Sequence, residues 1–252
     1  DLGKVKLSAN WMANSSDKKE LLNLYQGVER LSKICMKSNI VIPVGKDSLS
    51  MSTKWGNNQS CEVKSPLSLV LSAFASIEDV NNYVTPYTNR NSQLFLIDLG
   101  RGKDRMGGSA LDQTESFINH ESPNINKLDD LLNYFKLSQE LIRKKLLNAY
   151  HDRSDGGLIT TLIEIGFASN MSVDLKNIVK KSKTELIKFL FNEELGGVFV
   201  IDKKNEKEFS KLVRKYKLDA ITHKIGTLSN EDNPKLNIGS CNYSESLSVL
   251  RK

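Results

Sequence analysis

The densest group of reactive side chains in this 252-residue chain occupies positions 151–155, which read HDRSD and are followed by two glycines and an apolar, helix-like run. Carboxylates are good ligands for a hard cation such as Mg²⁺, and the first N–H groups of a helix attract anions. Asp152 or Asp155 could therefore hold a metal while the glycine amides bind phosphate. An N-cap in which Ser154 or Asp155 accepts backbone N–H bonds explains the same residues equally well.

Two further short segments have the composition of phosphate-binding loops. Gly107, Gly108 and Ser109 form a glycine-rich turn before a predicted helix, but the segment matches neither a Walker A loop nor GxGxxG. A simple turn is the favoured interpretation of that segment. In GKDS, residues 45–48, Lys46 and Asp47 could pair with each other or meet a phosphate and its metal, and an exposed loop pair is slightly favoured.

The sequence shows no set of catalytic residues. His120 and His223 have no acidic neighbours at the spacing of a triad or a metal site, and structural roles are expected for both. Neither a Ser-His-Asp nor a Cys-His pattern is present, which argues against a hydrolase. No residue is therefore predicted to be catalytic.

The elements that must position these residues follow from hydrophobic periodicity. In the first part, Asp17 and Glu20 have the spacing of a capping box for a helix that ends near residue 38. Pro43 interrupts a β-rich run and indicates an edge or strand-end position. Strands are predicted over residues 4–12, 40–44, 49–55 and 65–79.

The second part alternates strands and helices, and a domain boundary is expected near residue 90, within a polar segment. Its strands are predicted over residues 94–100, 171–175, 195–202 and 221–229. Its helices are predicted after the loop 101–113 and over residues 128–147, 157–168, 184–194 and 204–216. This order points to an α/β or α+β sandwich.

Composition limits the partners. The net charge is +6 and the pI about 9.0, but lysines alternate with acids over residues 203–215, which indicates a solvated helix face and no nucleic-acid partner. No apolar run approaches the roughly 20 residues that span a bilayer, so no membrane is expected. Three widely spaced cysteines and no signal peptide favour a reducing cytoplasm. A chain that begins at Asp1 is expected to be a segment of a longer protein.

Longer motifs carry a resemblance beyond local chemistry. LSANWM, IPVGKDSLSM, LSAFASIEDV, AYHDRSDGGL and LFNEELGGVFVI occur here in the order expected for phosphoribosylformylglycinamidine synthase of the large, single-chain type. The resemblance covers essentially all of residues 1–240. It implies an α+β fold similar to aminoimidazole ribonucleotide synthetase, from the second synthetase-like half of that enzyme. Residues 1–90 would end the strand-rich N-terminal subdomain, and residues 91–252 would form the C-terminal α/β sandwich subdomain.

The resemblance also implies a ligand site. The family's aspartate that matches Asp152 is a Mg²⁺ ligand, and the serine that matches Ser154 contacts ATP or ADP at an auxiliary nucleotide site. Gly156 and Lys46 are further candidates for nucleotide binding. The family's other metal ligands lie upstream of LSANWM, so the site is expected to be incomplete in this chain.

The activity that the resemblance implies is an ATP-dependent ligation. ATP would phosphorylate the formamide oxygen of formylglycinamide ribonucleotide, and ammonia from a glutaminase domain would displace that phosphate in purine biosynthesis. The remaining synthase and glutaminase domains would be partners, and the isolated segment is expected to be inactive. Two alternatives are a non-catalytic structural segment of the same enzyme without ligand and, less favoured, a stand-alone aminoimidazole ribonucleotide synthetase-like enzyme.

Overall fold

The computed structural model describes residues 2–56, 61–115, 121–176, 178 and 182–252. The chain separates into two compact units, Asp1–Val80 and Asn81–Lys252, and each is described by itself. The expected domains, residues 1–90 and 91–252, stay a prediction about which segments fold as units.

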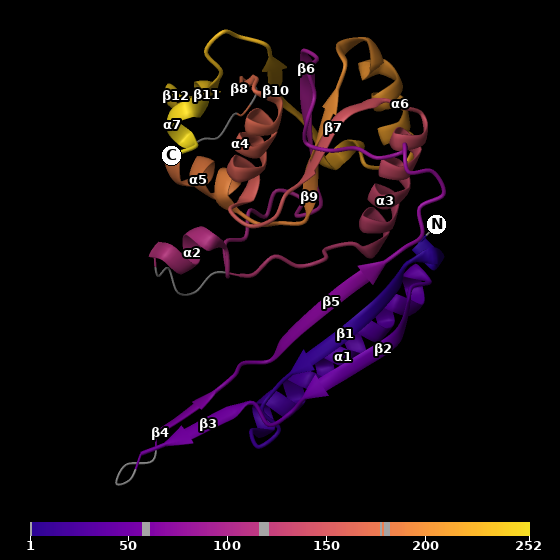
Figure 1. Cartoon of the computed structure of the whole chain (residues 1–252), viewed down its shortest axis with the longest axis vertical. Helices are drawn as coiled ribbons and strands as arrows, with labels where there is room; N and C mark the ends of the chain where they lie inside the picture. The colour runs from indigo at the N-terminus through magenta and orange to yellow at the C-terminus, as the bar shows by residue number, and fades with distance from the viewer. Residues whose placement is uncertain (1, 57–60, 116–120, 177, 179–181) are drawn as a thin grey trace. The chain divides into compact units, whose positions relative to one another are not determined.

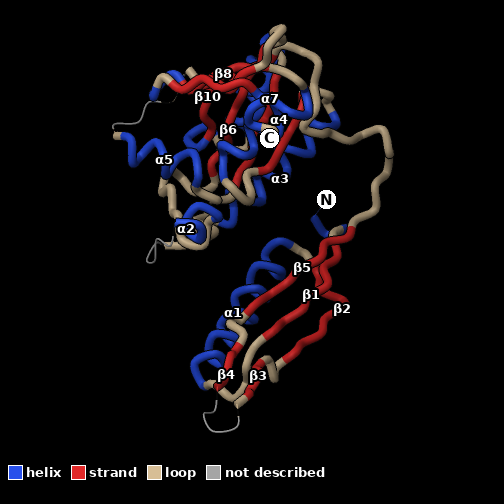
Figure 2. The backbone as a smooth tube through the Cα atoms, turned by 60° about the vertical axis from the view of Figure 1, so that its left-hand side comes forward, coloured by secondary structure: helices blue, strands red, loops and turns tan. Residues whose placement is uncertain are grey.

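The first unit is a small sheet backed by one long helix. Its three-stranded sheet has the order β2-β1-β5, with β1 parallel to β2 and antiparallel to β5, and β3 pairs with β4 in a separate ribbon. Figure 2 shows α1 lying along one face of the three-stranded sheet. The elements are the 3₁₀ turn Leu2–Lys4, β1 (Lys6–Met12), α1 (Lys18–Ser38), β2 (Val41–Ser48), β3 (Ser52–Trp55), β4 (Cys61–Lys64) and β5 (Ser68–Phe74).

The helix α1 begins where the sequence predicts. The Asp17 carboxylate accepts hydrogen bonds from the backbone N–H groups of Lys19 and Glu20, at 2.8 and 3.4 Å. The reciprocal half of the predicted capping box is not formed, because the Glu20 carboxylate instead accepts the N–H of Leu67, at 2.8 Å. Glu20 therefore joins the helix to the start of β5, and the helix ends at Asn39 in a left-handed conformation.

The predicted GKDS loop is wrong, since these residues belong to β2. Gly45 to Ser48 pair in continuous register with residues 9–12 of β1. Pro43 lies in the same strand, β2 is an edge strand, and the register with β1 shifts between Val41 and Val44, where the proline lies. The prediction of an edge position for this proline is confirmed.

The second unit is an α+β sandwich around a seven-stranded mixed sheet with the order β12-β11-β8-β10-β6-β9-β7 (Figure 1). The α+β expectation is confirmed. Its strands are β6 (Ser92–Asp98), β7 (Leu147–Asp152), β8 (Ser172–Leu175), β9 (Gly196–Ile201), β10 (Thr222–Ser229), β11 (Lys235–Ile238) and β12 (Tyr243–Ser246). Its helices are α2 (Ala110–Glu115), α3 (Leu128–Arg143), α4 (Gly157–Ser169), α5 (Lys183–Phe191), α6 (Glu206–Lys215) and α7 (Leu247–Leu250), with 3₁₀ turns at Lys203–Asn205, Asp219–Ile221 and Gly239–Cys241.

Both faces of this sheet are buried, which explains the unbroken apolar run of β6. Leu94 and Leu96 face a core shared with α4, α5 and α7, whereas Phe95 and Ile97 face a second core shared with α3 and α6. Successive residues of a strand point to opposite faces, so a strand covered on both sides needs apolar residues at nearly every position. The sheet thus holds the loops at its ends on a rigid frame.

The structure corrects the predicted helix 128–147. The helix α3 ends at Arg143, Lys145 adopts a left-handed φ of 53°, and the chain then enters β7. The motif AYHD therefore lies in a strand that pairs with β9, and periodicity missed it because β7 is short and follows the helix after a tight turn. The last elements, β11, β12 and α7, were not predicted either.

Among the described residues no helix is long and apolar enough to cross a membrane. The three cysteines, Cys35, Cys61 and Cys241, are free, and only Cys35 is buried. His223 lies in β10 as predicted, while His120 falls outside the described residues.

Candidate functional site

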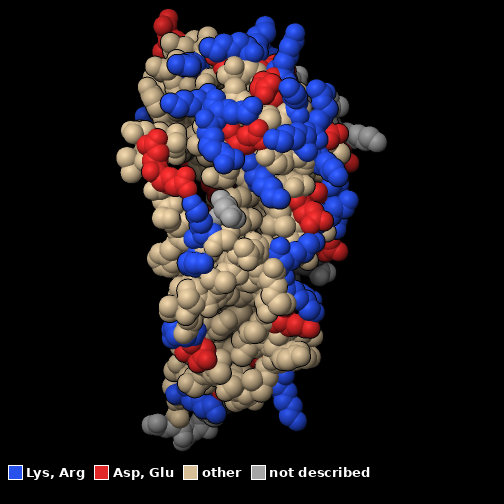
Figure 3. Space-filling view, turned by 90° about the vertical axis from the view of Figure 1, so that its right-hand side faces the viewer, with Lys and Arg blue, Asp and Glu red and all other residues tan. Residues whose placement is uncertain are grey.

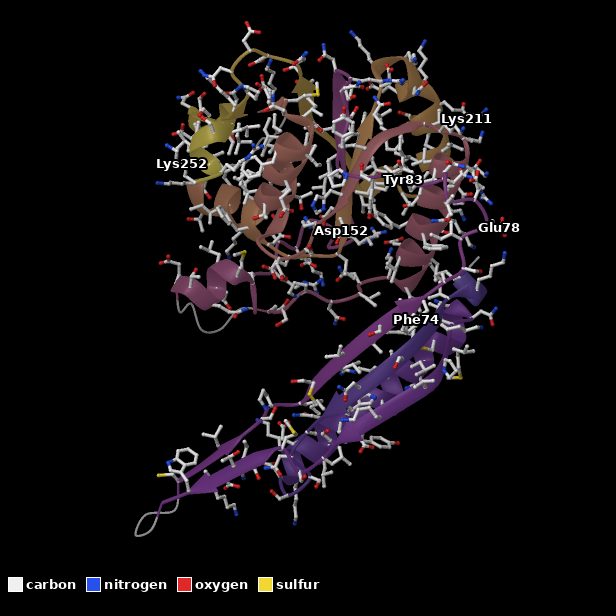
Figure 4. The ribbon with its side chains drawn as sticks, in the orientation of Figure 1. Phe74, Glu78, Tyr83, Asp152, Lys211 and Lys252 are labelled. Carbon is white, nitrogen blue, oxygen red and sulfur yellow. The ribbon has the colours of Figure 1, made fainter. Side chains whose placement is uncertain are left out.

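The HDRSD motif forms the corner between β7 and α4. Asp152 is the last residue of β7 and lies opposite Gly197 of β9, and the N–H of Arg153 donates to the carbonyl of Gly196, at 2.9 Å. Figure 4 labels Asp152 at this end of the sheet. The motif is therefore anchored to the sheet up to Arg153, and only Ser154 and Asp155 turn freely toward the helix.

Two glycines make the turn into α4 possible. Gly156 is the N-cap with φ 81° and Gly157 follows with φ 75°, conformations that other residues rarely adopt. A Cβ on Gly157 would lie 2.6 Å from the backbone carbon of Phe191, so this position also requires a missing side chain. The interpretation of Ser154 or Asp155 as a side-chain cap is wrong: the Gly157 N–H bonds to the carbonyl of Ser154, at 2.9 Å.

Asp152 combines a fixed backbone with an available carboxylate. Its carbonyl oxygen accepts the hydroxyl of Thr161 at 3.0 Å and lies 2.8 Å from Nδ1 of His151. Its side chain is 64% exposed. A carboxylate that the fold holds in place yet leaves in solvent is suited to an external ligand.

Asp152 could supply one ligand to a cation, but the described side chains around it do not complete a metal site. Nδ1 of His151 lies 3.4 Å from Oδ1 of Asp152, and Nε2 of the same ring lies 2.8 Å from the carboxylate of Glu164 on α4. Within the described part of the chain, no three His, Cys, Asp or Glu side chains group as a metal site. Because Mg²⁺ takes one or two carboxylates and completes its shell with phosphate oxygens and water, Asp152 fits such a role.

Ser154 and Gly156 lie on the same corner but differ in what they offer a ligand. Ser154 is exposed, and its hydroxyl makes no hydrogen bond to the residues that the structure describes. The N–H of Gly156 instead donates to Oε1 of Glu193, at 2.8 Å, and the same oxygen accepts the N–H of Ala110, also at 2.8 Å. An internal carboxylate thus occupies the position where phosphate was predicted.

The GGS loop has the geometry of the turn alternative. The N–H of Gly107 donates to the carbonyl of Glu121, and that of Gly108 donates to the carboxylate of Asp112. The hydroxyl of Ser109 is buried and accepts the N–H of Asp112, so it caps α2. The amides of Gly107 and Gly108 are therefore engaged inside the protein.

Both predicted loops nevertheless line one cavity. A hollow of about 340 Å³ lies between the start of α2 and the start of α4. Its lining residues are Gly108, Ala110, Gln113, Thr114, Asp155 and Glu193. The sequence placed no residue of 184–194 in the site, so Glu193 is a contributor that pattern reasoning missed.

Lys46 lies in the first unit, away from these loops along the chain. Its Nζ donates to the hydroxyl of Ser48, at 2.7 Å, and no ion pair joins it to Asp47 within the described residues. Neighbouring strand residues point to opposite faces, which separates the Lys and Asp side chains. Lys46 and Asp47 do line a larger hollow of about 590 Å³ between α1 and β2.

Two buried ion pairs support the corner, and neither was predicted from the sequence. Arg153 pairs with Asp98, at 2.6 Å, and its Nε donates to the carbonyl of Glu194, also at 2.6 Å. Arg105 makes a two-pronged pair with the Glu194 carboxylate, at 2.5 and 2.7 Å. These hydrogen bonds raise the pKa of the Arg105 guanidinium against the opposing effect of burial. The pairs join the loops after β6 and β7 to the start of β9.

The partners of these arginines are far apart in sequence. Arg153 stands between acidic residues, which suggests a local pair, yet it bonds to Asp98 across the sheet. A buried charge requires a partner, so burial of Arg153 and Arg105 was the one signal that could have prompted a search for distant carboxylates. Burial is not visible in a single sequence.

Comparisons with known families and structures agree with this architecture. Residues 95–239 match the model of the AIR synthase related protein, C-terminal domain, and residues 1–76 match the FGAR-AT PurM_N-like domain. The structure is similar to T. maritima PurL complexed with ATP, with a TM-score of 0.64 and 14% identity. That alignment covers 99% of this chain and 38% of the PurL chain, so this chain spans well under half the length of that relative.

A second group of similar structures consists of hydrogenase maturation proteins. E. coli HypE, a hydrogenase maturation protein, aligns with a TM-score of 0.65 and 14% identity over 96% of this chain and 72% of its own. A HypE in complex with ATP aligns with a TM-score of 0.62 and 13% identity, over 98% of this chain and 74% of that one. At these identities the similarity establishes a shared fold.

Proposed function

This chain belongs to the family of AIR synthase related proteins, and from that membership we propose that it is a segment of an ATP-dependent phosphoribosylformylglycinamidine synthase. The observation that carries the proposal is the match of residues 1–76 to the FGAR-AT PurM_N-like domain, which names that amidotransferase and not the hydrogenase maturation proteins. The remaining synthase domains and a glutaminase would be supplied by other parts of a longer protein.

The proposed contribution of this segment is nucleotide binding at the β7–α4 corner. Asp152 would be one ligand of Mg²⁺, and the Ser154 hydroxyl would bind the nucleotide. The support is that both side chains are exposed while the backbone beneath them is held by the ladder with β9 and by Thr161. When bound, Mg²⁺ would neutralise phosphate charge and orient the phosphate chain. Lys46 and Gly156 stay weaker candidates for the nucleotide site, and Gly107, Gly108 and Ser109 for the phosphate loop.

The role of the corner is positioning and not chemistry. Its exposed side chains are the carboxylates of Asp152 and Asp155 and the hydroxyl of Ser154, and among the described residues no hydrogen bond joins that hydroxyl to a base. We therefore place the reacting groups of the full enzyme, which would transfer phosphate to a formamide oxygen and accept ammonia, outside this segment. The segment alone is expected to be inactive as a ligase.

Calorimetric titration of the 252-residue chain with Mg-ADP tests the nucleotide site. Binding is expected, and Asp152→Asn should weaken it at least tenfold when Mg²⁺ is present but much less when EDTA removes the metal. Asp155→Asn, a neighbouring exposed carboxylate, is the matched control and should bind as the parent chain does. Equal affinities for parent and Asp152→Asn in the presence of Mg²⁺ would remove Asp152 from the site.

A second candidate function has one specific observation in its favour. Glu193 already satisfies the N–H of Gly156 and of Ala110, so the predicted phosphate position is filled from within. In that case the segment is a structural part of the same enzyme that retains no ligand. No heat of Mg-ADP binding in either the segment or a full-length synthase would favour this reading.

A further inference from the structure

A row of five cations follows the outer side of α6. Lys207, Lys211 and Arg214 are four and three residues apart, which places them on one face of the helix. Lys203 lies in the 3₁₀ turn before α6 and Lys217 lies two residues past its end, and all five residues are exposed. We call these five residues the basic ridge. Figure 4 shows Lys211 pointing away from the sheet, on the side opposite the buried residues of α6.

No carboxylate in the described part of the chain forms an ion pair with the basic ridge. Four acidic residues lie beside it, and each pairs with a lysine outside the ridge. These pairs are Glu206 with Lys224 at 2.9 Å, Glu208 with Lys144 at 3.4 Å, Glu140 with Lys215 at 2.6 Å, and Asp202 with Lys204 at 3.4 Å. Figure 3 shows lysine and arginine side chains gathered on this side of the second unit.

This arrangement refines the sequence expectation for residues 203–215. The alternating charges do form a solvated helix face, but the structure sorts them into neutral pairs on the flanks and an unpaired row along the middle. Like charges one turn apart destabilise a helix, and no carboxylate of the described residues pairs with the row to offset that repulsion. A partner that supplies the missing carboxylates would remove that repulsion.

The basic ridge is narrow, and this favours a protein partner over a nucleic acid or a membrane. The positive row is one side chain wide, and carboxylates of the flanking pairs lie on both sides. A nucleic-acid duplex or an anionic bilayer is uniformly negative and would meet those carboxylates as well. The apolar residues of α6, Phe209, Leu212 and Val213, are buried and leave no anchor for a membrane. Tyr216 is held by Glu140, so no free ring is offered to a base.

We propose that the basic ridge is a docking surface for an acidic helix of a partner protein. A helix rises about 5.4 Å per turn, so a partner helix with one Asp or Glu per turn on one face matches the repeat of the ridge. The contact is a row of charge-assisted hydrogen bonds between two exposed helices, and salt weakens it. The proposal does not depend on the nucleotide site.

The test uses the 252-residue chain and a synthetic helical peptide with one glutamate per turn on one face and neutral residues elsewhere. Fluorescence anisotropy at low and at physiological salt measures the dissociation constant. We expect binding that weakens with salt and that falls at least tenfold in the variant Lys207→Gln, Lys211→Gln, Arg214→Gln. The control variant Lys18→Gln, Lys19→Gln, Arg30→Gln removes three exposed cations from α1 and should bind within twofold of the parent.

Three results would overturn the proposal. One is that the ridge variant binds the glutamate peptide as the parent does. Another is that a peptide with glutamine in place of glutamate binds equally well. The third is that a 20-base-pair DNA duplex, vesicles rich in phosphatidylserine, or a second copy of the chain occupies the ridge more tightly than the peptide. Circular dichroism confirms that the glutamine variant is folded, since it only removes like-charge repulsion.

Discussion

The Glu193 carboxylate accepts a hydrogen bond from the backbone N–H of Gly156, at 2.8 Å, where α4 begins. The same oxygen accepts the N–H of Ala110 at the start of α2, so one side chain closes two helix ends at once. Helix N-termini attract negative charge, and here the chain itself provides it. Glu193 therefore acts as an internal anion in the cavity that the two predicted loops share.

Removing this internal anion should destabilise the second unit. Glu193→Ala removes the carboxylate that both helix-start N–H groups bond, and we expect a loss of about 0.5–2 kcal/mol in the free energy of unfolding, as for the loss of a helix cap. Asp155→Ala is the matched control, because Asp155 lines the same cavity without a hydrogen bond to either helix end. Six of the seven tyrosines lie in the second unit, whereas both tryptophans, Trp11 and Trp55, lie in the first, so urea denaturation followed by tyrosine absorbance reports mainly on the second unit. Equal losses in the two variants would contradict the role of Glu193.

The buried pair between Arg105 and Glu194 should be far more sensitive than an exposed one. Arg105→Met leaves the fully buried Glu194 carboxylate without its partner, and removing one member of a buried pair costs about 3–5 kcal/mol. Glu208→Gln breaks the pair of Glu208 with Lys144, in which the two side chains are 41% and 44% exposed, and should cost about 0–1 kcal/mol. The urea midpoints of the two variants are measured side by side. Similar midpoints would mean that breaking the buried pair costs no more stability than breaking the exposed one.

Local signals predicted much of the fold because they act over one turn or one strand. The cap at Asp17 and the apolar run of β6 depend on neighbouring residues, and both appear in the structure. The strand β5 also forms, but its residues are half-buried or exposed and do not alternate in burial. The GKDS segment failed for the opposite reason. Its glycine and charged residues look like a loop, but pairing with β1 keeps them extended, and pairing partners 36 residues apart are invisible to a local pattern.

In the candidate site, too, local features could be predicted from the sequence and long-range contacts could not. The helix predicted after the two glycines is present, and Gly156 and Gly157 both have positive φ at its start. The capping role of Ser154 failed because Gly156 is itself the N-cap. Glu193 and Glu194 could not have been placed, since their partners come from the two segments after β6 and β7, which only the sheet brings together.

Alkaline pH should destabilise the second unit through two partly buried tyrosines. The hydroxyl groups of Tyr134 and Tyr150 lie 2.8 Å apart, and burial raises the pKa of both, that of Tyr134 well above its ordinary value of 10.0. Below pH 10 both rings are neutral in the folded and unfolded chains, so stability is fully present. As pH rises through 10, the unfolded chain releases protons that the native state retains, and stability falls.

The variant Tyr150→Phe isolates this effect. It removes one partly buried titrating group, so the loss of stability between pH 9 and pH 11 should be smaller by up to about 1.4 kcal/mol per pH unit. Tyr83→Phe is the control, because the Tyr83 side chain is exposed, and its pH profile should follow the parent. Urea unfolding at several pH values gives both profiles, and an unchanged slope in Tyr150→Phe would rule out the tyrosine pair as the cause.

Two glycines with similar backbone angles allow the cost of a left-handed backbone to be measured apart from the cost of steric crowding. Gly102 and Gly157 have φ values of 70° and 75°, but a Cβ on Gly102 meets open space, whereas one on Gly157 meets Phe191 and Asn192 backbone atoms at 2.6 and 2.7 Å. Gly102→Ala should therefore cost only the left-handed conformation, about 1–2 kcal/mol. Gly157→Ala should cost clearly more, because α4 must move away from the end of α5. Thermal denaturation compares the two, and a Gly157→Ala midpoint equal to that of Gly102→Ala would show that the close approach at this corner is not required for the fold.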